Sequence, residues 1–331
     1  MGNAPHPAIA SPSRVGGDRT QVLHRGGILM TPADLHLQVD VAHWGWSIAW
    51  FLWFVGIAGM GSVAYYFVRR SALIITIFAS LTIGLLLVVS HLGRWWNLPR
   101  TLYLMVLDFD FNLGSWMLLG IVTLSVHLVL TLLLLIGHLP ALTRRIAWLK
   151  WTETLRAQAG YRGLFAGVGA FATVYSGFLL TQAAGIPLWN TSLIPILWVV
   201  SGSIAAIAVI ELLYVLGLVD ANVSAAGVRI GMVLDGVKLL AVLGFLHVAL
   251  SYGSAGARYG AILMTQGDLA LMLWGGVIGI GILVPLAIGA YTLLREKRKS
   301  LLAVSAVCAL SGVFFLRAAV LLAGTFEPLV L

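Results

Sequence analysis

The chain has 331 residues, of which 60% are hydrophobic and only 10% are charged. A soluble domain carries about 25% charged residues, so this composition excludes a surface that faces water and predicts an integral membrane protein. The formal net charge is +8, but the basic residues gather in short clusters between apolar runs. That arrangement is typical of membrane interfaces and argues against nucleic acid as a partner.

Residues 1–40 are rich in glycine, proline, serine and histidine and contain no apolar core. We expect a loosely ordered N-terminal arm, with no cleavable signal peptide ahead of His43 because no hydrophobic stretch precedes it. Eight apolar runs follow, and each approaches the roughly 20 residues that a helix needs to cross a bilayer. The predicted spans are 44–67, 73–91, 114–137, 163–183, 192–218, 232–251, 270–294 and 300–323. The predicted fold class is therefore all-α integral membrane with eight transmembrane helices.

Lysines and arginines predict the orientation of these spans. The connections after the first, third, fifth and seventh spans carry more of them than the connections on the other side. We therefore expect the former connections to lie in the cytoplasm and both termini on the non-cytoplasmic side. The expected location is the cell (cytoplasmic) membrane, crossed several times.

The second predicted span ends in a concentrated cluster, His91-Leu-Gly-Arg94-Trp-Trp, with Asp108 and Asp110 in the following connection. Interfacial anchoring alone would explain basic residues and tryptophans at a membrane boundary. A quinone headgroup, however, needs polar partners for two carbonyl oxygens, aromatic walls and a route for protons. His91 suits the first need, and the two aspartates suit the last.

Two further groups fall on the same predicted side of the membrane. His43 and Trp46 begin the first span, and Tyr175 lies late in the fourth. One interpretation is a solvated interfacial histidine, belt tryptophans and a tyrosine whose hydroxyl bonds a neighbour. The alternative is that they complete a quinone headgroup site with His91.

Cys308 is the only cysteine and lies inside a late apolar run. One cysteine cannot form an internal disulfide or ligate an iron–sulfur cluster by thiolates alone. We therefore expect any cluster chemistry to belong to a partner. We also expect no haem bound by this chain, on the separate ground that no predicted helix carries the paired histidines of a diheme anchor.

Five short motifs occur in order between residues 40 and 325. They are His91-Leu-Gly-Arg94, Gly114-Ser-Trp116-Met-Leu-Leu-Gly120, Tyr175-Ser-Gly-Phe-Leu-Leu180, Trp189-Asn-Thr-Ser-Leu-Ile-Pro195 and Leu316-Arg-Ala-Ala-Val-Leu-Leu-Ala-Gly324. Together they resemble the NrfD/PsrC family of membrane quinone-interacting subunits. The sequence departs from the family at Trp95, where proline is common.

The resemblance implies two four-helix bundles, which would occupy residues 41–183 and 184–331. It also implies menaquinone or another quinone as cofactor, bound at the outer membrane face in the first bundle. The implied partners are a ferredoxin-like iron–sulfur subunit docked on that face and a large catalytic subunit, either a molybdopterin enzyme or a hydrogenase. The chain would then be a membrane anchor that reacts with quinone, while specificity for the terminal substrate would belong to another polypeptide. The expected quinone-binding residues are His43, Trp46, His91, Arg94, Asp108, Trp116 and Tyr175.

A second set of polar residues lies within the predicted spans: Glu211, Asp235, Lys238, His247 and Arg317. An ionisable group at the centre of a bilayer costs at least about 2.5 kcal/mol, so such groups are functional candidates. Asp235 and Lys238 are three residues apart and share one helix face. They are either a structural ion pair or part of a path that brings protons from the cytoplasm.

Two other classes of protein fit the composition. A haem-bearing cytochrome-type anchor would use histidines such as His91, His127 or His247 as axial ligands, but no predicted helix carries the paired histidines of a diheme anchor. His127 is otherwise interpreted as a hydrogen-bonded core histidine. A secondary transporter would place a pair of broken helices at the membrane midplane, and the sequence shows no such pair.

Overall fold

The computed structural model describes residues 23–25, 28–30, 42, 44–92, 94–107, 114–295 and 298–327. The chain divides into a unit of residues 1–39 with 328–331 and a unit of residues 40–327. In the first unit, β1 (Leu23–Arg25) and β2 (Ile28–Met30) pair in antiparallel register. The remainder of the predicted N-terminal arm lies outside the described residues.

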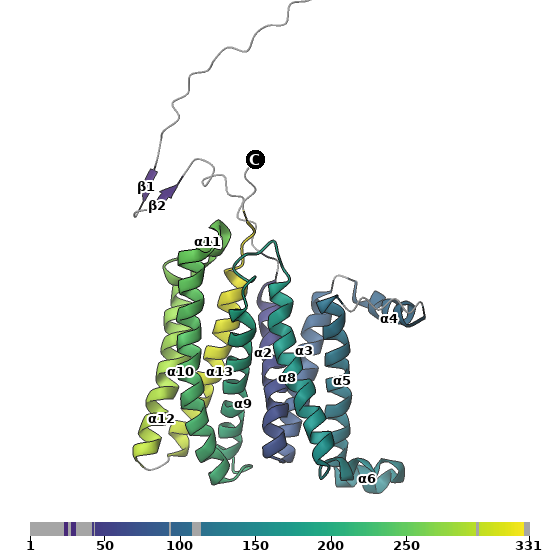
Figure 1. Ribbon diagram of the computed structural model, residues 1–331. Helices are drawn as coiled ribbons and strands as arrows, with labels where there is room; N and C mark the ends of the chain where they lie inside the picture. The colour runs from purple at the N-terminus through teal and green to yellow at the C-terminus, as the bar shows by residue number, and fades with distance from the viewer. Residues whose placement is uncertain are drawn as a thin grey trace, which may run out of the picture. The chain divides into compact units, whose positions relative to one another are not determined.

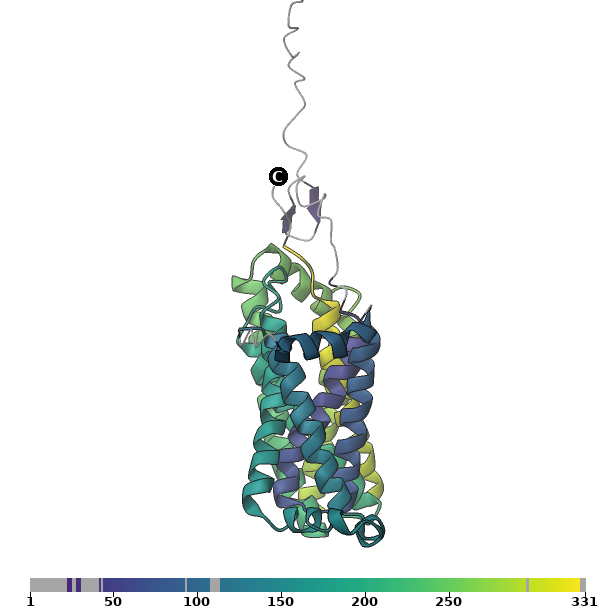
Figure 2. The same ribbon diagram turned by 90° about the vertical axis from the view of Figure 1, so that its right-hand side faces the viewer.

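Eight helices of the second unit are long and apolar enough to cross a membrane. They are α2 (Trp46–Phe67), α3 (Ser71–His91), α5 (Trp116–Gly137), α8 (Ala159–Thr181), α9 (Leu193–Val215), α10 (Ala221–Tyr252), η3 with α12 (Leu271–Leu294) and α13 (Lys299–Leu322). This confirms an all-α membrane protein with eight spans. Figures 1 and 2 show these helices running side by side.

The sixth span is longer than the sequence predicts. The hydropathy pattern predicts a start at residue 232, but α10 begins at Ala221 and has 32 residues, or about 48 Å of helix. Residues 221–231 include Asn222, Ser224 and Arg229, so their hydropathy is too low to mark a span. They still form a helix because three alanines favour it and no proline interrupts it.

Six shorter helices lie in the connections: η1 (Trp95–Asn97), α4 (Leu98–Leu107), α6 (Pro140–Arg145), η2 (Ala147–Leu149), α7 (Thr152–Leu155) and α11 (Ala255–Thr265). Figure 1 shows α4 and α11 at one end of the long helices and α6 at the other, and Figure 2 shows α4 lying across the helix direction. We call the end that carries α4 and α11 the α4 end. We call the opposite end the basic end, and its connections are residues 68–70, 138–158, 216–220 and 295–298.

Three long helices form the centre of this unit. α2 packs against α3, α8, α9 and α13, while α9 packs against α8, α10 and α13 as well as α2. Most of α2, α9 and α13 is buried, whereas most of α3, α5 and α10 is not. The helices approach closely where both partners carry glycine, since a side chain at Gly281 of η3 would collide with Gly312 of α13.

Candidate functional site

Tyr175 lies on α8 at a close crossing with α5 near the α4 end. Its side chain is buried, and its phenol ring packs directly over Gly120 of α5, where a side chain of any size would collide with the ring. On the same two helices, Trp116 stacks on Phe178 with ring centroids 4.9 Å apart. The phenol hydroxyl makes no hydrogen bond to any described residue. Within the part of the chain that the structure describes, the crossing therefore leaves this hydroxyl available as a donor near an aromatic wall.

His91 ends α3 and faces the first turn of α2. Its Nδ1 lies 3.2 Å from the Ser47 hydroxyl, and the ring is exposed. Trp46 precedes Ser47 and is half exposed, with its ring stacked on Phe314 of α13 at 6.1 Å. Arg94 follows in the turn before η1 and is exposed. Among the described residues, no hydrogen bond or ring contact joins His91 to Tyr175.

Three predicted residues cannot be placed in this way. His43, Asp108 and Asp110 lie outside the described residues. Their predicted roles remain sequence-based expectations. Two residues at this end were not predicted, Ser47 and Gly120. The sequence carried a signal for Gly120, since it ends one of the five family motifs, whereas Ser47 is found only by its distance to His91.

A buried ion pair lies in the other half of the unit. Asp235 and Lys238 are both buried on α10, and the Lys238 Nζ is 3.3 Å from the Asp235 Oδ1. This contact is an ion pair without the geometry of a hydrogen bond, since Oδ1 has no hydrogen-bond partner among the described residues. The ammonium instead donates a hydrogen bond of 2.6 Å to the carbonyl oxygen of Gly281 on η3.

The helix around Gly281 is irregular, and the sequence offers a cause. Pro285 lies four residues after Gly281 and has no N–H group to donate to it in an α-helix. The preceding residues Leu271–Leu283 are wound as a π-helix, a form that is rare beyond a single turn and is frequent at functional sites. Pro285 was thus a sequence signal for irregular winding in the helix that supplies the Gly281 carbonyl to Lys238.

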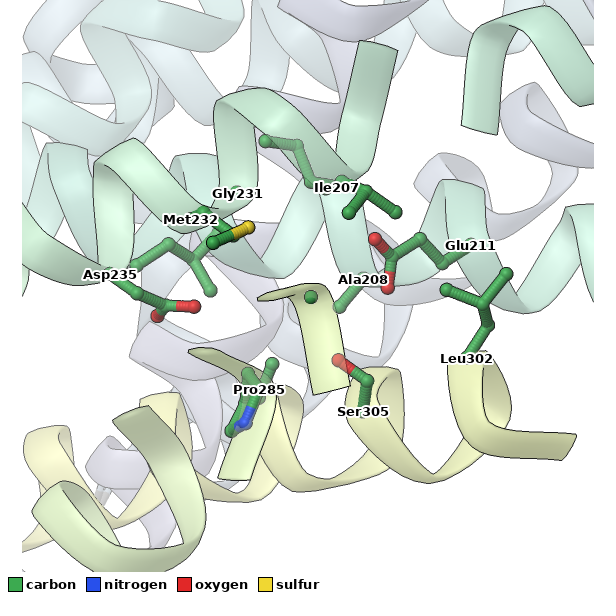
Figure 3. Close-up of a pocket in the computed structure, with 13 residues that line it drawn as sticks. Ile207, Ala208, Glu211, Gly231, Met232, Asp235, Pro285, Leu302 and Ser305 are labelled. Atoms are coloured by element: carbon green, nitrogen blue, oxygen red, sulfur yellow. The ribbon is translucent and has the colours of Figure 1, made fainter. Parts of the chain in front are cut away.

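Figure 3 shows the cavity beside this pair. Glu211 of α9 and Asp235 of α10 point into it from opposite sides, and Ser305 of α13 lies between them. Its volume is about 20 Å³, and roughly 10–15 Å³ on this measure is enough for one water molecule. Glu211 is buried, so a water here would have carboxylate and hydroxyl partners. The structure therefore brings together three of the five residues predicted for the proton path: Glu211, Asp235 and Lys238.

Arg317 of α13 is completely buried where α2, α9 and α13 meet. Its Nη1 donates to the Ser201 hydroxyl at 3.1 Å, and its guanidinium lies 5.4 Å from the centre of the Trp198 ring. Gly56 of α2 provides the space for Nη2, because a side chain there would collide with it. Neither Nη2 nor Nε has a hydrogen-bond partner among the described residues.

His247 lies apart from this group. It is exposed on α10, its ring centroid is 5.8 Å from that of Tyr252, and its Nδ1 is 3.5 Å from the Ser251 hydroxyl. No described hydrogen bond or ion pair connects it to Asp235 or Lys238.

Two histidines pair with hydroxyl groups of α2: the buried His127 of α5 and the half-buried His138, which directly follows α5. The His127 Nε2 is 2.7 Å from the Ser62 hydroxyl, which confirms the interpretation of His127 as a hydrogen-bonded core histidine. At the basic end, the His138 Nε2 is 2.6 Å from the Tyr65 hydroxyl. Burial, assisted by the positive charge of Arg156, lowers the pKa of His138 to about 4, so this histidine is neutral at neutral pH.

An aromatic groove of about 440 Å³ opens between α2 and α13. It is lined by Trp50, Trp53, Val307, Leu310, Ser311, Phe314 and Phe315. The Trp53 Nε1 donates to the Leu310 carbonyl at 3.0 Å, which fixes one wall. The groove lies beside Trp46, which stacks on the same Phe314. The groove was not predicted from the sequence. From the sequence alone, Trp46 can be interpreted as a tryptophan of the aromatic belt at the membrane interface.

Comparison with known proteins places this arrangement in a family. The model of the family described as polysulphide reductase, NrfD, matches residues 36–328. The C subunit of the polysulfide reductase of Wolinella succinogenes is 28% identical over 321 residues, covering 87% of this chain and 96% of that protein. The NrfD protein of Escherichia coli K12 is 27% identical over 315 residues, covering 85% and 94%. An NrfD homologue of Haemophilus influenzae is 24% identical, covering 85% and 94%.

Proposed function

Because the chain belongs to the polysulphide reductase NrfD family, we propose that it is the membrane anchor and quinone-reactive subunit of a multi-subunit respiratory oxidoreductase. In this role it exchanges electrons between the membrane quinone pool and an iron–sulfur partner subunit. The terminal substrate is handled by another polypeptide. The observation that carries the proposal is the buried Tyr175, packed on Gly120 beside the stacked pair of Trp116 and Phe178.

The residues at this crossing have the chemistry that a quinone requires. A phenol can donate a hydrogen bond to a carbonyl oxygen, an imidazole can donate one or take up a proton, and tryptophan provides an apolar wall. Menaquinone or another quinone supplies two-electron, two-proton redox chemistry when it is bound. In the proposed site, the Tyr175 hydroxyl orients the headgroup, and His91 contacts it and exchanges protons. Trp46, Arg94 and Trp116 line it, with His43 and Asp108 as further contacts.

The proposed partners dock at the α4 end. A ferredoxin-like iron–sulfur subunit would cover η1 and α4, and a large molybdopterin or hydrogenase subunit would bind that subunit in turn. Support comes from the exposed Trp95, Trp96 and Tyr103 in this connection, because aromatic residues are enriched in protein interfaces. We place the α4 end and both termini outside the cytoplasm, since the basic end should face the cytoplasm.

The helix contacts also support two four-helix groups within this membrane unit, α2, α3, α5 and α8 against α9, α10, η3 with α12, and α13. In this division, residues 41–183 would hold the quinone site and residues 184–331 the buried charges. Glu211, Asp235, Lys238 and Arg317 would then carry protons from the basic end toward α2. His247 is predicted from the sequence for the same path, but its exposed position gives that role no support.

The test of the quinone site is oxidation of a water-soluble quinol analogue by the purified complex. Tyr175→Phe removes one hydrogen bond to the headgroup, worth about 0.5–1.5 kcal/mol, so turnover at low quinol concentration should fall by about threefold to tenfold. Tyr161→Phe is the matched control, because it makes the same change on α8 at a hydroxyl that donates to Leu130. Equal kinetics for both variants and the unmodified complex would remove Tyr175 from the site.

A further inference from the structure

The connection between α5 and α8 folds back on the basic end of α5 and packs against it. Thr143, Leu149, Thr152 and Leu155 are buried, and Gly137 at the end of α5 is in such close contact with the Thr152 backbone that a side chain would not fit. The Thr143 hydroxyl also donates to the Glu153 carboxylate. These contacts give the short helices α6, η2 and α7 one fixed position against the membrane domain.

The exposed side of this connection carries three cations and two tryptophans. Arg144, Arg145, Lys150, Trp148 and Trp151 are all exposed, Trp148 by 73%. The Arg144 Nε donates to the Pro140 carbonyl at 3.0 Å, which holds that guanidinium against the first turn of α6. We call these five residues the basic platform.

No carboxylate at the basic end neutralises these cations, as far as the described residues extend. Glu153 accepts the Thr143 hydroxyl and forms no salt bridge with a described residue, while Asp220 pairs with Arg70 in another connection. Among the described residues, none of the basic platform cations makes a salt bridge. Arg162 shows by contrast how a structural arginine is used here, because it is buried and donates at 2.8 Å to the carbonyl oxygens of Arg156 and Ala157.

From this arrangement we propose that the basic platform binds the phosphate headgroup of an anionic phospholipid in the same membrane leaflet. Arginine and lysine bind phosphate by charge-assisted hydrogen bonds, and arginine does so in a bidentate manner. Tryptophan prefers the depth of the headgroups, where its ring contacts acyl chains and its N–H faces water. An acidic protein would satisfy the charge, but it would leave Trp148 and Trp151 without the lipid boundary they suit. The proposal does not depend on the quinone function.

Native mass spectrometry of the detergent-purified complex tests this binding. The complex is titrated with phosphatidylglycerol and with phosphatidylcholine, which has no net charge, and bound lipids are counted. Phosphatidylglycerol should be retained preferentially. The double variant Arg144→Gln with Arg145→Gln should weaken the binding of phosphatidylglycerol by about tenfold to thirtyfold. The reason is that each basic residue near a membrane surface adds a similar attraction for anionic lipid, and this variant removes two. Trp148→Ala should reduce the retention of both lipids.

Two matched controls separate a fixed site from diffuse attraction. Arg100→Gln with Arg258→Gln removes two exposed cations at the α4 end, and Arg295→Gln with Arg298→Gln removes two at the basic end outside the platform. Both should retain phosphatidylglycerol. Equal loss in the second control would overturn the proposal in favour of general charge attraction. If the Arg144→Gln with Arg145→Gln variant lost a protein subunit but retained lipid, the basic platform would be assigned to a protein partner instead.

The unmodified complex alone can also contradict the proposal, so the test does not depend on a variant that folds. Equal retention of phosphatidylglycerol and phosphatidylcholine by the unmodified complex would show that no anionic headgroup is selected. Arg144→Lys with Arg145→Lys keeps both charges, and it should retain an intermediate amount of phosphatidylglycerol because the bidentate contacts are lost.

Discussion

Lys238 on α10 donates a hydrogen bond of 2.6 Å to the carbonyl oxygen of Gly281, a residue of the π-helix η3. The ammonium therefore serves two buried acceptors, Gly281 and Asp235. An unpaired carboxylate in a membrane interior is costly. This relationship makes Lys238 a structural residue whether or not it also moves protons.

We predict that Lys238→Met destabilises the chain by about 3–5 kcal/mol, because it leaves the buried Asp235 carboxylate without its ion-pair partner. The double variant Asp235→Asn with Lys238→Met should recover most of this stability. Thermal unfolding in detergent measures the stability of both variants. A double variant as unstable as Lys238→Met would contradict the ion-pair account.

The same double variant tests the proposed proton path. If the pair is only structural, quinol oxidation and proton release in proteoliposomes should both be normal in the double variant. If Glu211, Asp235 and Lys238 carry protons, the complex should assemble but turn over slowly or without coupling to a membrane potential. Normal coupling in the double variant would end the proton-path proposal, whatever its stability.

The spans were predictable because each depends on the local hydropathy of about 20 residues. The start of α10 was missed because residues 221–231 are helical without being strongly apolar. Contacts between helices that are far apart in the chain could not be predicted from the sequence pattern. The distance from His91 to Ser47 and the packing of Tyr175 on Gly120 depend on how α2, α3, α5 and α8 cross. The pairing of Asp235 with Lys238 was predictable from helix periodicity, whereas Glu211 joins them only through tertiary packing.

Gly120→Ala should disturb the proposed quinone site more than Tyr175→Phe does. A methyl group at residue 120 would occupy the space of the phenol ring, so Tyr175 must move or α5 must separate from α8. We expect a rise in the KM for quinol with little change in the amount of assembled complex. Gly163→Ala on α8 is the control, since a methyl group there meets open space. Unchanged kinetics in Gly120→Ala would show that this crossing does not hold the headgroup.

Topology is testable by labelling single cysteines in a Cys308→Ala background. Arg258→Cys lies at the α4 end and Arg298→Cys at the basic end, and both positions are exposed. A membrane-impermeant maleimide applied outside spheroplasts should label residue 258 and spare residue 298. Without the iron–sulfur partner, Asp108→Cys should be labelled from outside like residue 258. In the assembled complex, the partner should protect it from labelling. The reverse labelling pattern would invert the orientation and move the proposed docking face to the cytoplasm.

The last prediction concerns acid stability at the basic end. His138 has a folded-state pKa of about 4, below its ordinary value of 6.5, because burial and the nearby Arg156 disfavour its charged form. Between these two pH values the unfolded chain therefore binds a proton that the folded chain does not, so stability should decrease as the pH falls from 6.5 toward 4. Above that range, His138 should contribute no pH dependence.

His138→Gln should flatten this part of the pH profile, because glutamine can accept the Tyr65 hydrogen bond but does not titrate. The measurement compares the unfolding temperatures of the variant and the unmodified protein at about pH 7.5 and about pH 5, on either side of the unperturbed histidine pKa. Tyr65→Phe serves as the control, since it removes the same hydrogen bond of 2.6 Å but keeps the imidazole. That variant should be less stable at both pH values and still lose stability in acid. An acid transition that persists unchanged in His138→Gln would show that another group is responsible.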